Sequence, residues 1–331
     1  MKHIIGVLCA SLALCASMLT GCGASSDTAQ VANKIEVVCT TFPSYDWARE
    51  IVGDAGDKID LSLLIDDGTD LHSYQPSVED MAKLADADLL VYVGGESDSW
   101  IKDAIASGGN TEQHHLNMLE VLGDSVREEE IVEGMQAERD HEADHDHANP
   151  EEVEYDEHVW LSLRCASDLV DSLAAELGAL DAEHASTFSA NASAYKEKLS
   201  QLDERYVSAV AAAPKKTLLF GDRFPFVYLT SDYGLSYYAA FAGCSAETEA
   251  SFETVAKLAD RIDELGLTCV LTIENSDQRI AQTIIGNTKD KNQKILVMDS
   301  LQSTTRQDID AGKTYLGTME DNLSVLQTAL A

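Results

Sequence analysis

One stretch in the middle of the chain combines two kinds of side chain that bind metal ions. Residues 138–158 read ERDHEADHDHANPEEVEYDEH. Imidazole nitrogen suits zinc, copper, nickel and iron, and carboxylate oxygen suits manganese, calcium and magnesium, so the mixture favours capture of divalent cations. We interpret His141, His145 and His147 as the metal-capturing groups of this loop. A solvated acidic loop that contains histidines by chance is the alternative interpretation.

Four other side chains could form a metal site in a cleft. His72, Asp222 and Asp299 each follow an apolar run that reads as a β-strand, and His158 lies at the exit of the acidic loop. In open α/β sheets, ligands bind at the loops that follow the carboxyl ends of strands. We therefore predict a four-ligand metal site made of His72, His158, Asp222 and Asp299. Taken singly, a loop histidine is more often a surface group, and a strand-end aspartate is more often a helix cap.

Apolar, β-branched runs alternate with helical patterns along most of the chain, and this alternation predicts the framework that positions the site. The strand-like runs are 35–40, 59–65, 89–93, 217–220, 269–273 and 294–298. Helical patterns begin near Ser44, Ser77 and Ser97, and they return over 252–265 and 278–285. The pattern predicts an α/β fold with two βα lobes and the metal site in the cleft between them.

A long helix is predicted between the two lobes. Apolar residues recur at alternating steps of four and three from Phe188 to Val210, with no Gly or Pro before Pro214. A helix over about 183–212 would be roughly 45 Å long and would join the lobes as a stiff connector. A coiled-coil dimer is the competing interpretation of the same apolar stripe.

The N-terminal residues predict export and a lipid anchor. The apolar run from Ile4 to Leu19 is too short for a membrane-spanning helix and fits a signal peptide. It leads into Thr20-Gly21-Cys22, and this order matches the lipobox at which bacterial lipoproteins are cut and acylated. We therefore expect Cys22 to carry lipid and to hold the protein at the outer face of the bacterial cell membrane.

These patterns divide the chain into consecutive parts. The polar residues that follow Cys22 read as a flexible linker. We predict a lipoprotein signal peptide (1–21), a flexible tether (22–33), an N-terminal α/β lobe (34–180) that includes the acidic His-rich loop (124–157), a linker helix (181–213) and a C-terminal α/β lobe (214–331).

The charge of the chain excludes one class of partner. The sequence has 23 basic and 58 acidic residues, and residues 124–157 contain 15 acids and 2 bases. Nucleic acid is excluded as a partner because its phosphates would be repelled. A negative surface instead concentrates cations and steers them inward, although acidity also keeps an exported protein soluble.

The exported part of the chain would keep Cys39, Cys165, Cys244 and Cys269. An oxidising compartment permits disulfides between them, and the sequence leaves three pairings open. A Cys244–Cys269 bond is preferred because both residues lie in the C-terminal half. No two of these cysteines are close enough in sequence for a CxxC-type zinc site.

Several segments carry a resemblance to a known family. Residues 71–80 read LHSYQPSVED, residues 86–94 read DADLLVYVG, and residues 157–162 read EHVWLS. They closely resemble the metal-binding solute receptors of bacterial ABC importers, the zinc and manganese group, and the resemblance covers nearly all of residues 33–331. It implies two α/β lobes joined by a long rigid helix, a metal buried between them, and delivery of that metal to an ABC permease and its ATPase. A His- and acid-rich loop before the second histidine is typical of the zinc members.

The resemblance also implies ligand positions. His72, His158 and Asp299 fall on three of the ligand positions of that family. The position where the family usually carries His or Glu is occupied by Arg223, which has no lone pair to donate and repels cations. The remaining candidates for this ligand are water, Asp222 and Glu274. Arg223 would instead close the lobes by pairing with a carboxylate such as Glu247 or Glu249.

These observations predict a receptor that binds Zn²⁺ outside the membrane and hands it over for import, with Mn²⁺ as the alternative metal. Two imidazoles and two carboxylates suit zinc and also admit manganese. A surface adhesin with a structural metal is a further alternative. An exported zinc hydrolase is less favoured, because it requires a general base beside an open metal position, and the predicted site offers none. We therefore expect no enzymatic activity.

Overall fold

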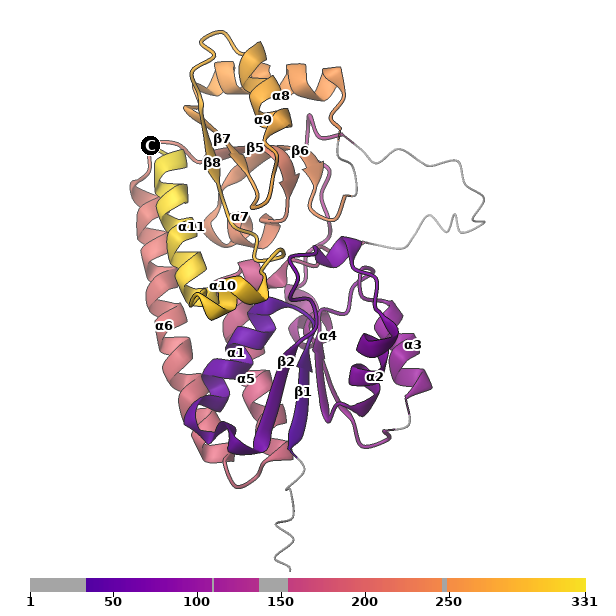
Figure 1. Cartoon of the computed structure of the whole chain (residues 1–331). Coiled ribbons are helices and arrows are strands. Elements are labelled where there is room, and N and C mark those ends of the chain that lie inside the picture. The colour runs from indigo at the N-terminus through magenta and orange to yellow at the C-terminus, as the bar shows by residue number, and fades with distance from the viewer. Residues whose placement is uncertain (1–33, 109, 137–153, 246–248) are drawn as a thin grey trace, which may run out of the picture. The chain divides into compact units, whose positions relative to one another are not determined.

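The computed structural model describes residues 34–331 except 109, 137–153 and 246–248 (Figure 1). Residues Lys34–Ala331 form one compact unit. The predicted signal peptide and tether lie outside the described residues, and so do Cys22, His141, His145 and His147. What the sequence predicts for them stays a prediction.

The first lobe is built on a parallel sheet with the strand order β2-β1-β3-β4. Its strands are β1 (Ile35–Cys39), β2 (Ile59–Leu63), β3 (Leu89–Tyr92) and β4 (His114–Asn117). Its helices are α1 (Phe42–Val52), α2 (Val78–Asp86), α3 (Trp100–Ser107), α4 (Met118–Leu122) and α5 (Leu163–Leu180). Figure 1 shows α1 and α5 on one side of the sheet and α2 and α3 on the other. Helices on both faces explain why every residue of β3 is buried and apolar.

Helix α2 starts at the predicted N-cap residue, Ser77. The Ser77 hydroxyl accepts a hydrogen bond from the Asp80 N–H at 3.2 Å, and the Asp80 carboxylate accepts the Ser77 N–H at 2.8 Å. This capping box satisfies two backbone donors at the helix start. It therefore fixes where α2 begins, just after the turn that carries His72.

The second lobe repeats the arrangement with the strand order β6-β5-β7-β8, again all parallel. Its strands are β5 (Thr217–Phe224), β6 (Ser236–Ala242), β7 (Cys269–Thr272) and β8 (Lys294–Val297). Its helices are α7 (Val227–Tyr233), α8 (Phe252–Leu265) and α9 (Arg279–Asn287). The α/β fold with two βα lobes is confirmed. Strands β4 and β6 were not predicted, and β5 continues past the predicted end at Phe220.

One helix, α6 (Ala185–Ala212), follows the first lobe and precedes the second. Its 28 residues correspond to about 42 Å of helix. The apolar stripe from Phe188 to Val210 is buried within the chain, where α6 packs on α1, α5 and the C-terminal helix α11 (Tyr315–Ala329). Because the chain itself covers this stripe, the coiled-coil dimer interpretation is wrong.

The C-terminal segment returns to the first lobe after β8. Short helix α10 (Arg306–Asp310) starts where the Arg306 N–H donates to the Asp66 carbonyl at 2.7 Å. Tyr315 then donates its N–H to the buried Asp46 carboxylate at 2.8 Å and its hydroxyl to the Trp160 carbonyl at 2.6 Å. Thus part of the predicted C-terminal lobe (214–331) packs on the N-terminal lobe, and the two lobes are joined by more than α6.

No disulfide bond joins the described cysteines. Cys39, Cys165 and Cys269 are buried free thiols, and Cys244 is a partly exposed one. The preferred Cys244–Cys269 pairing is therefore wrong. The Cys269 sulfur instead lies 3.9 Å from the Ala329 carbonyl oxygen, at the end of α11.

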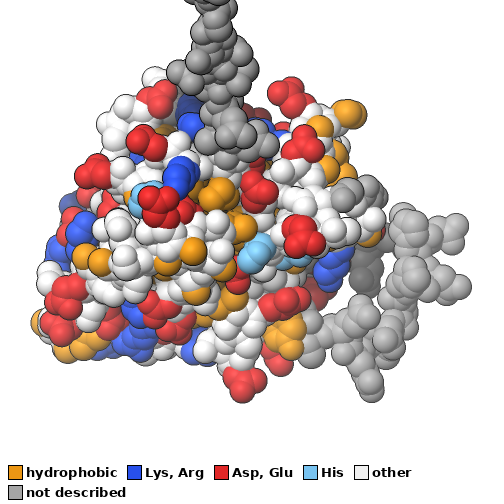
Figure 2. All heavy atoms as spheres, turned by 90° about the horizontal axis from the view of Figure 1, so that it is seen from below, with side chains coloured by type: hydrophobic (Ala, Val, Ile, Leu, Met, Phe, Trp, Pro, Cys, Tyr) orange, Lys and Arg blue, Asp and Glu red, His pale blue; other side chains and the backbone are white. Residues whose placement is uncertain are grey.

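The surface of the described part agrees with the acidic composition. In Figure 2, carboxylate side chains are spread over the face shown, and separate basic side chains interrupt them. Among the described residues, no helix has both the length and the apolar character needed to cross a bilayer.

Candidate metal centre

The first histidine lies on a short turn that its own neighbours hold in place. His72 sits in a 3₁₀ turn, Leu71–Ser73, that is capped by Asp70, whose carboxylate accepts the His72 N–H at 2.9 Å. On the ring, Nδ1 lies 2.6 Å from the Ser97 hydroxyl. The side chain is only 6% exposed. Because Nδ1 is engaged, Nε2 is the nitrogen that remains for a metal.

The second histidine is fully buried. Asp156 accepts the His158 backbone N–H at 2.9 Å and lies 3.1 Å from the ring Nδ1. A carboxylate at Nδ1 fixes the tautomer and the ring orientation, and it leaves the Nε2 lone pair free, as in metal-binding histidines. Trp160 packs edge-on against the ring and bonds through its indole N–H to the Ser300 carbonyl of the second lobe at 2.9 Å.

The structure brings the two free ring nitrogens together, with His72 Nε2 lying 3.0 Å from His158 Nε2. Two lone pairs at this distance require a proton or a cation between them. Tetrahedral zinc, with Zn–N bonds of about 2.0–2.1 Å, would hold the two nitrogens roughly 3.3 Å apart. The pair therefore fits zinc after a movement of a few tenths of an ångström.

The two imidazoles differ in their affinity for a proton. Burial and then the neighbouring His158 lower the pKa of His72 to about 3. Burial alone would also lower the pKa of His158, but attraction to Asp156 outweighs it, and the pKa of His158 is raised. In the absence of a metal, His72 therefore stays neutral and accepts the hydrogen bond between the rings.

Two buried carboxylates, Glu157 and Asp98, lie near the His72–His158 pair, and backbone N–H groups engage both of them. Glu157 accepts the Ser97 N–H at 2.9 Å through Oε1, and its Oε2 lies 3.8 Å from His72 Nδ1. Asp98 accepts backbone N–H groups from Val93 at 2.8 Å and Gly94 at 3.0 Å. Burial and the nearby Glu157 raise the pKa of Asp98 to about 7. The centre thus lies in a negative environment that attracts cations.

A third metal-binding atom lies beside the histidines, and the sequence reasoning missed it. The ring nitrogens of His72 and His158 and the sulfur of Cys244 all lie within 4.8 Å of one another, and no other such group occurs among the described residues. Cys244 follows strand β6, which was not predicted. Burial and then the charge of Asp156 raise the pKa of its thiol.

The centre opens onto a cavity of about 870 Å³. His72 and Cys244 line it, together with acidic side chains that include Glu129 and Glu157. His158 is not among the lining residues, since it lies buried behind them. A cation in the cavity would therefore meet carboxylates as well as the His72 imidazole and the Cys244 thiol.

Asp222 lies apart from this group. Strand β5 continues through it to Phe224, with an irregularity in the pairing between Phe220 and Arg223, so Asp222 is a strand residue and not a loop residue. Its Oδ1 accepts the Arg223 N–H at 2.9 Å, and its side chain lines a different cavity of about 380 Å³. Asp222 lies outside the group of His72, His158 and Cys244, and its role as a ligand stays a prediction.

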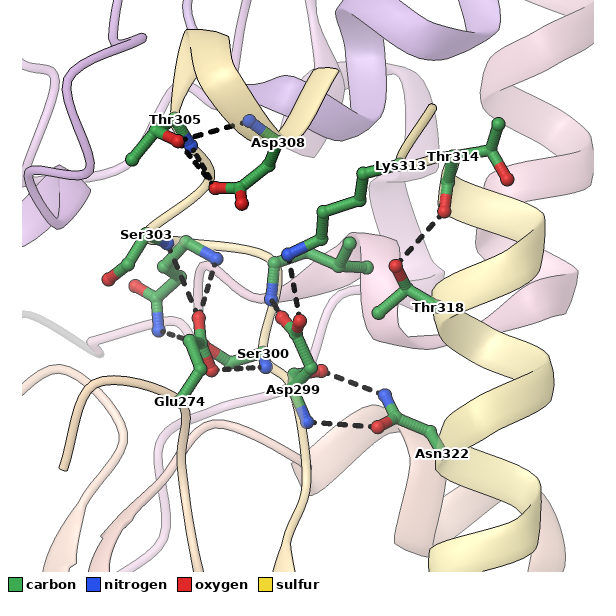
Figure 3. A network of polar contacts seen from close by, with 12 residues as sticks. Glu274, Asp299, Ser300, Ser303, Thr305, Asp308, Lys313, Thr314, Thr318 and Asn322 are labelled. Atoms are coloured by element: carbon green, nitrogen blue, oxygen red, sulfur yellow. Dashed lines mark hydrogen bonds and ion pairs between the residues drawn. The ribbon is translucent and has the colours of Figure 1, made fainter. Parts of the chain in front are cut away.

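Asp299 is also engaged elsewhere (Figure 3). Its Oδ1 accepts the Leu301 N–H at 2.8 Å, and its Oδ2 lies 2.7 Å from Nζ of Lys313. Asn322 on α11 bonds to its backbone on both sides. Both carboxylate oxygens are therefore occupied, and Asp299 as a ligand stays a prediction that requires Lys313 to move.

Glu274 organises the loop that follows Asp299. Its carboxylate accepts the Ser300 N–H at 2.6 Å, the Ser300 hydroxyl at 2.8 Å and the Gln302 N–H at 3.1 Å (Figure 3). Burial and then the charge of Asp299 raise its pKa. Glu274 therefore has a structural role here, and the arrangement does not favour it as a metal ligand.

Arg223 joins the two lobes, although through a different partner from those expected. Its Nη2 lies 2.6 Å from Oδ2 of Asp70, the residue that caps the His72 turn. Burial opposes the charge on Asp70, but Arg223 and His72 outweigh it and hold the pKa of that carboxyl below its usual range. The expectation of Glu249 is wrong, and Glu247 lies outside the described residues.

Known proteins resemble the chain over most of its length. A zinc-binding lipoprotein, AdcA of Streptococcus pneumoniae, is 32% identical over 98% of this chain and 60% of its own length. The high-affinity zinc uptake system protein ZnuA of Bacillus subtilis is 29% identical over 96% of both chains. The Zn(II)-bound ZnuA-like domain of Streptococcus pneumoniae AdcA superposes with a TM-score of 0.68 at 28% identity, covering 90% of this chain and 99% of that domain. The chain thus spans about three fifths of the AdcA relative.

The family match agrees with the two-lobed fold and covers both lobes. Residues 37–329 match the family described as zinc-uptake complex component A, periplasmic. The matched range includes His72, His158 and Cys244. Since it extends over nearly all the described residues, the chain belongs to the family of zinc-uptake complex component A.

Proposed function

We propose that this protein is a receptor that captures Zn²⁺ outside the cell membrane and delivers it to an ABC permease and its ATPase. The observation that carries the proposal is the His72–His158 pair, whose Nε2 atoms lie 3.0 Å apart. Ser97 and Asp156 engage the other ring nitrogens and so leave both Nε2 atoms for a metal. Zinc binding by relatives of similar sequence supports the choice of metal.

The location and the anchor belong to the same proposal. Export, acylation of Cys22 and attachment to the outer face of the membrane follow from the sequence pattern and agree with a family described as periplasmic. His141, His145 and His147 would collect ions ahead of the buried centre. Deleting 138–152 should then reduce zinc uptake under chelation and leave the affinity of the centre unchanged.

A receptor needs no catalytic step, and we propose none. Residues 141–145 read HEADH, which has the HExxH spacing of many zinc hydrolases. That motif acts when a helix holds both histidines on one face. These residues lie outside the described part, and the family match favours uptake over hydrolysis.

Competitive titration of metal-stripped protein with zinc and manganese tests the proposal. His72→Ala and His158→Ala should each lower zinc affinity by at least about tenfold. Each change removes one metal ligand and leaves the residue that held its ring, Ser97 or Asp156, without that partner. His115→Ala is the matched control, because the His115 side chain is exposed and its Nε2 lies 2.9 Å from Oε1 of Gln113, away from the metal centre. Wild-type affinity in both ligand variants would contradict the proposal.

Two other outcomes would favour the alternatives. Manganese affinity equal to zinc affinity would indicate a manganese receptor of the same class. Metal-independent binding to a host or cell-wall ligand, with normal zinc uptake in a strain lacking the protein, would indicate an adhesin with a structural metal.

A further inference from the structure

We propose that Cys244 is the third zinc ligand and that its thiolate makes the receptor favour zinc over manganese. This inference rests on the proposed function, because it concerns the same centre. It adds a ligand that the resemblance to metal receptors does not imply. At the position where that resemblance implies a His or Glu ligand, this chain has Arg223.

The loop that carries Cys244 is pressed against His158. Cys244 follows β6 after Gly243, and a Cβ at Gly243 would lie 3.0 Å from Cε1 of His158 and 2.9 Å from the Phe224 carbonyl oxygen. Only glycine permits this approach without a shift of the loop. The Cys244 N–H then donates to Glu129 at 2.9 Å, which fixes the direction of the chain just beyond the glycine.

The sulfur is placed so that a small movement completes a zinc site. It lies within 4.8 Å of a ring nitrogen of each histidine, forms no disulfide and faces the same cavity as His72. Tetrahedral zinc with bonds of about 2.3 Å to sulfur and 2.0 Å to nitrogen places these atoms roughly 3.6 Å apart. A shift of at most about 1.2 Å therefore brings the sulfur to bonding distance of an ion held by the two nitrogens.

The three ligands come from both lobes. The histidines belong to the first lobe, whereas Cys244 follows β6 of the second. A zinc ion bound to all three would therefore bridge the lobes. The guanidinium of Arg223, which stands in place of the usual ligand, pairs with the Asp70 carboxylate. Its positive charge is therefore neutralised by Asp70.

A thiolate changes which metals the centre prefers. Thiolate is a soft ligand that suits zinc, and manganese prefers oxygen donors. Two imidazoles and one thiolate leave a fourth, open position, which is filled by water or by a carboxylate that reaches the ion. Selectivity would thus come from the sulfur, and Cys244→Asp should reduce it by supplying oxygen instead.

Cobalt substitution and metal competition test this inference on the purified protein. Co²⁺ bound to wild type should show the near-ultraviolet thiolate-to-cobalt charge-transfer band. Cys244→Ser should abolish the band and lower zinc affinity by at least about tenfold, as expected for loss of a ligand. Cys244→Asp should lower the ratio of zinc to manganese affinity. Cys269→Ser is the matched control, because its buried thiol faces Ala329.

The outcomes separate this inference from the function on which it rests. If wild type binds zinc through His72 and His158 but shows no charge-transfer band, Cys244 is not a ligand and the inference fails alone. If the band persists in Cys244→Ser, Cys244 is likewise not the ligand, and again only this inference fails. If wild type binds no zinc, both proposals fail. Thermal unfolding of each metal-free variant by circular dichroism shows that a lost band does not reflect a lost fold.

Discussion

Arg223 on β5 forms a 2.6 Å ion pair with Asp70, and Asp70 also accepts the backbone N–H of His72. One carboxylate therefore connects the second lobe to the turn that presents a metal-binding histidine. Both side chains are largely buried, with 19% and 12% exposed. Such a pair links the second lobe to the backbone that carries the His72 ring.

We predict that Arg223→Gln and Asp70→Asn each weaken zinc binding without changing the number of ions bound. The physical reason is that either change breaks the ion pair and loosens the His72 turn. Because both act through one contact, the double variant should bind little worse than the poorer single variant. The coupling energy expected for two residues in contact is about 0.5–3 kcal/mol, measurable by zinc titration of all four proteins. Strictly additive losses would show that the two residues act separately.

The pKa of Asp98 predicts how stability changes with pH. Its folded pKa of about 7 lies above its ordinary value of 3.8, because burial and Glu157 disfavour the charge more than Lys102 and two backbone N–H groups favour it. The folded state thus holds the proton more tightly than the unfolded state. The stabilising contribution is fully present below about pH 4 and is lost as the pH rises through 7.

Urea unfolding of the metal-free protein between pH 5 and 8 measures this effect. Relative to Asp98→Asn, which has no such proton to lose, wild type should lose up to about 1.4 kcal/mol per pH unit until the pH passes 7. A constant difference between the two proteins over this range would contradict the assignment.

Substitution of Asp299 tests whether this residue is a metal ligand or a structural residue. Both oxygens of Asp299 are engaged by Leu301 and Lys313. We expect Asp299→Asn to lower the free energy of unfolding by about 1.5 kcal/mol, the scale of hydrogen bonds to charged groups, and to change zinc affinity less than His158→Ala does. Lys313→Met should also destabilise the protein. If Asp299→Asn abolishes zinc binding at normal stability, Asp299 is a ligand and Lys313 releases it when zinc binds.

The fold was largely predictable because its strands are apolar and β-branched. Runs such as 89–93 contain little besides Leu and Val, and a strand buried on both faces needs nothing else. The sequence pattern does not predict strand β6, because β6 reads SYYAAFA and alanine is depleted in strands. Ala239 and Ala240 are fully buried there, so tertiary packing selects small residues against their propensity.

Because strand β6 is not predicted from the sequence, Cys244 is not predicted at the metal centre either. The rule that places ligands after strand ends points to His72, and it also points to Cys244 once β6 is known to end at Ala242. Asp222 lies apart from the two histidines, because β5 extends beyond Phe220 and carries it past the predicted strand end. Pairing of Asp299 with Lys313 depends on the return of the C-terminal segment, and no local pattern encodes that contact.

Gly243 offers a final test of how closely the second lobe must approach the histidines. A Cβ there would lie 3.0 Å from Cε1 of His158, a ring that is fully buried and held by Asp156. The ring cannot retreat, so Gly243→Ala should push the Cys244 loop outward and weaken zinc binding by at least about tenfold, as loss of metal-site support does. Gly286→Ala in α9 is the matched control, because its Cβ meets nothing within 4 Å. That change should leave zinc binding intact and stabilise the helix by about 0.5–1 kcal/mol. Equal zinc affinity in the two variants, measured by competitive titration, would show that the loop bearing Cys244 need not touch His158 for the metal to bind.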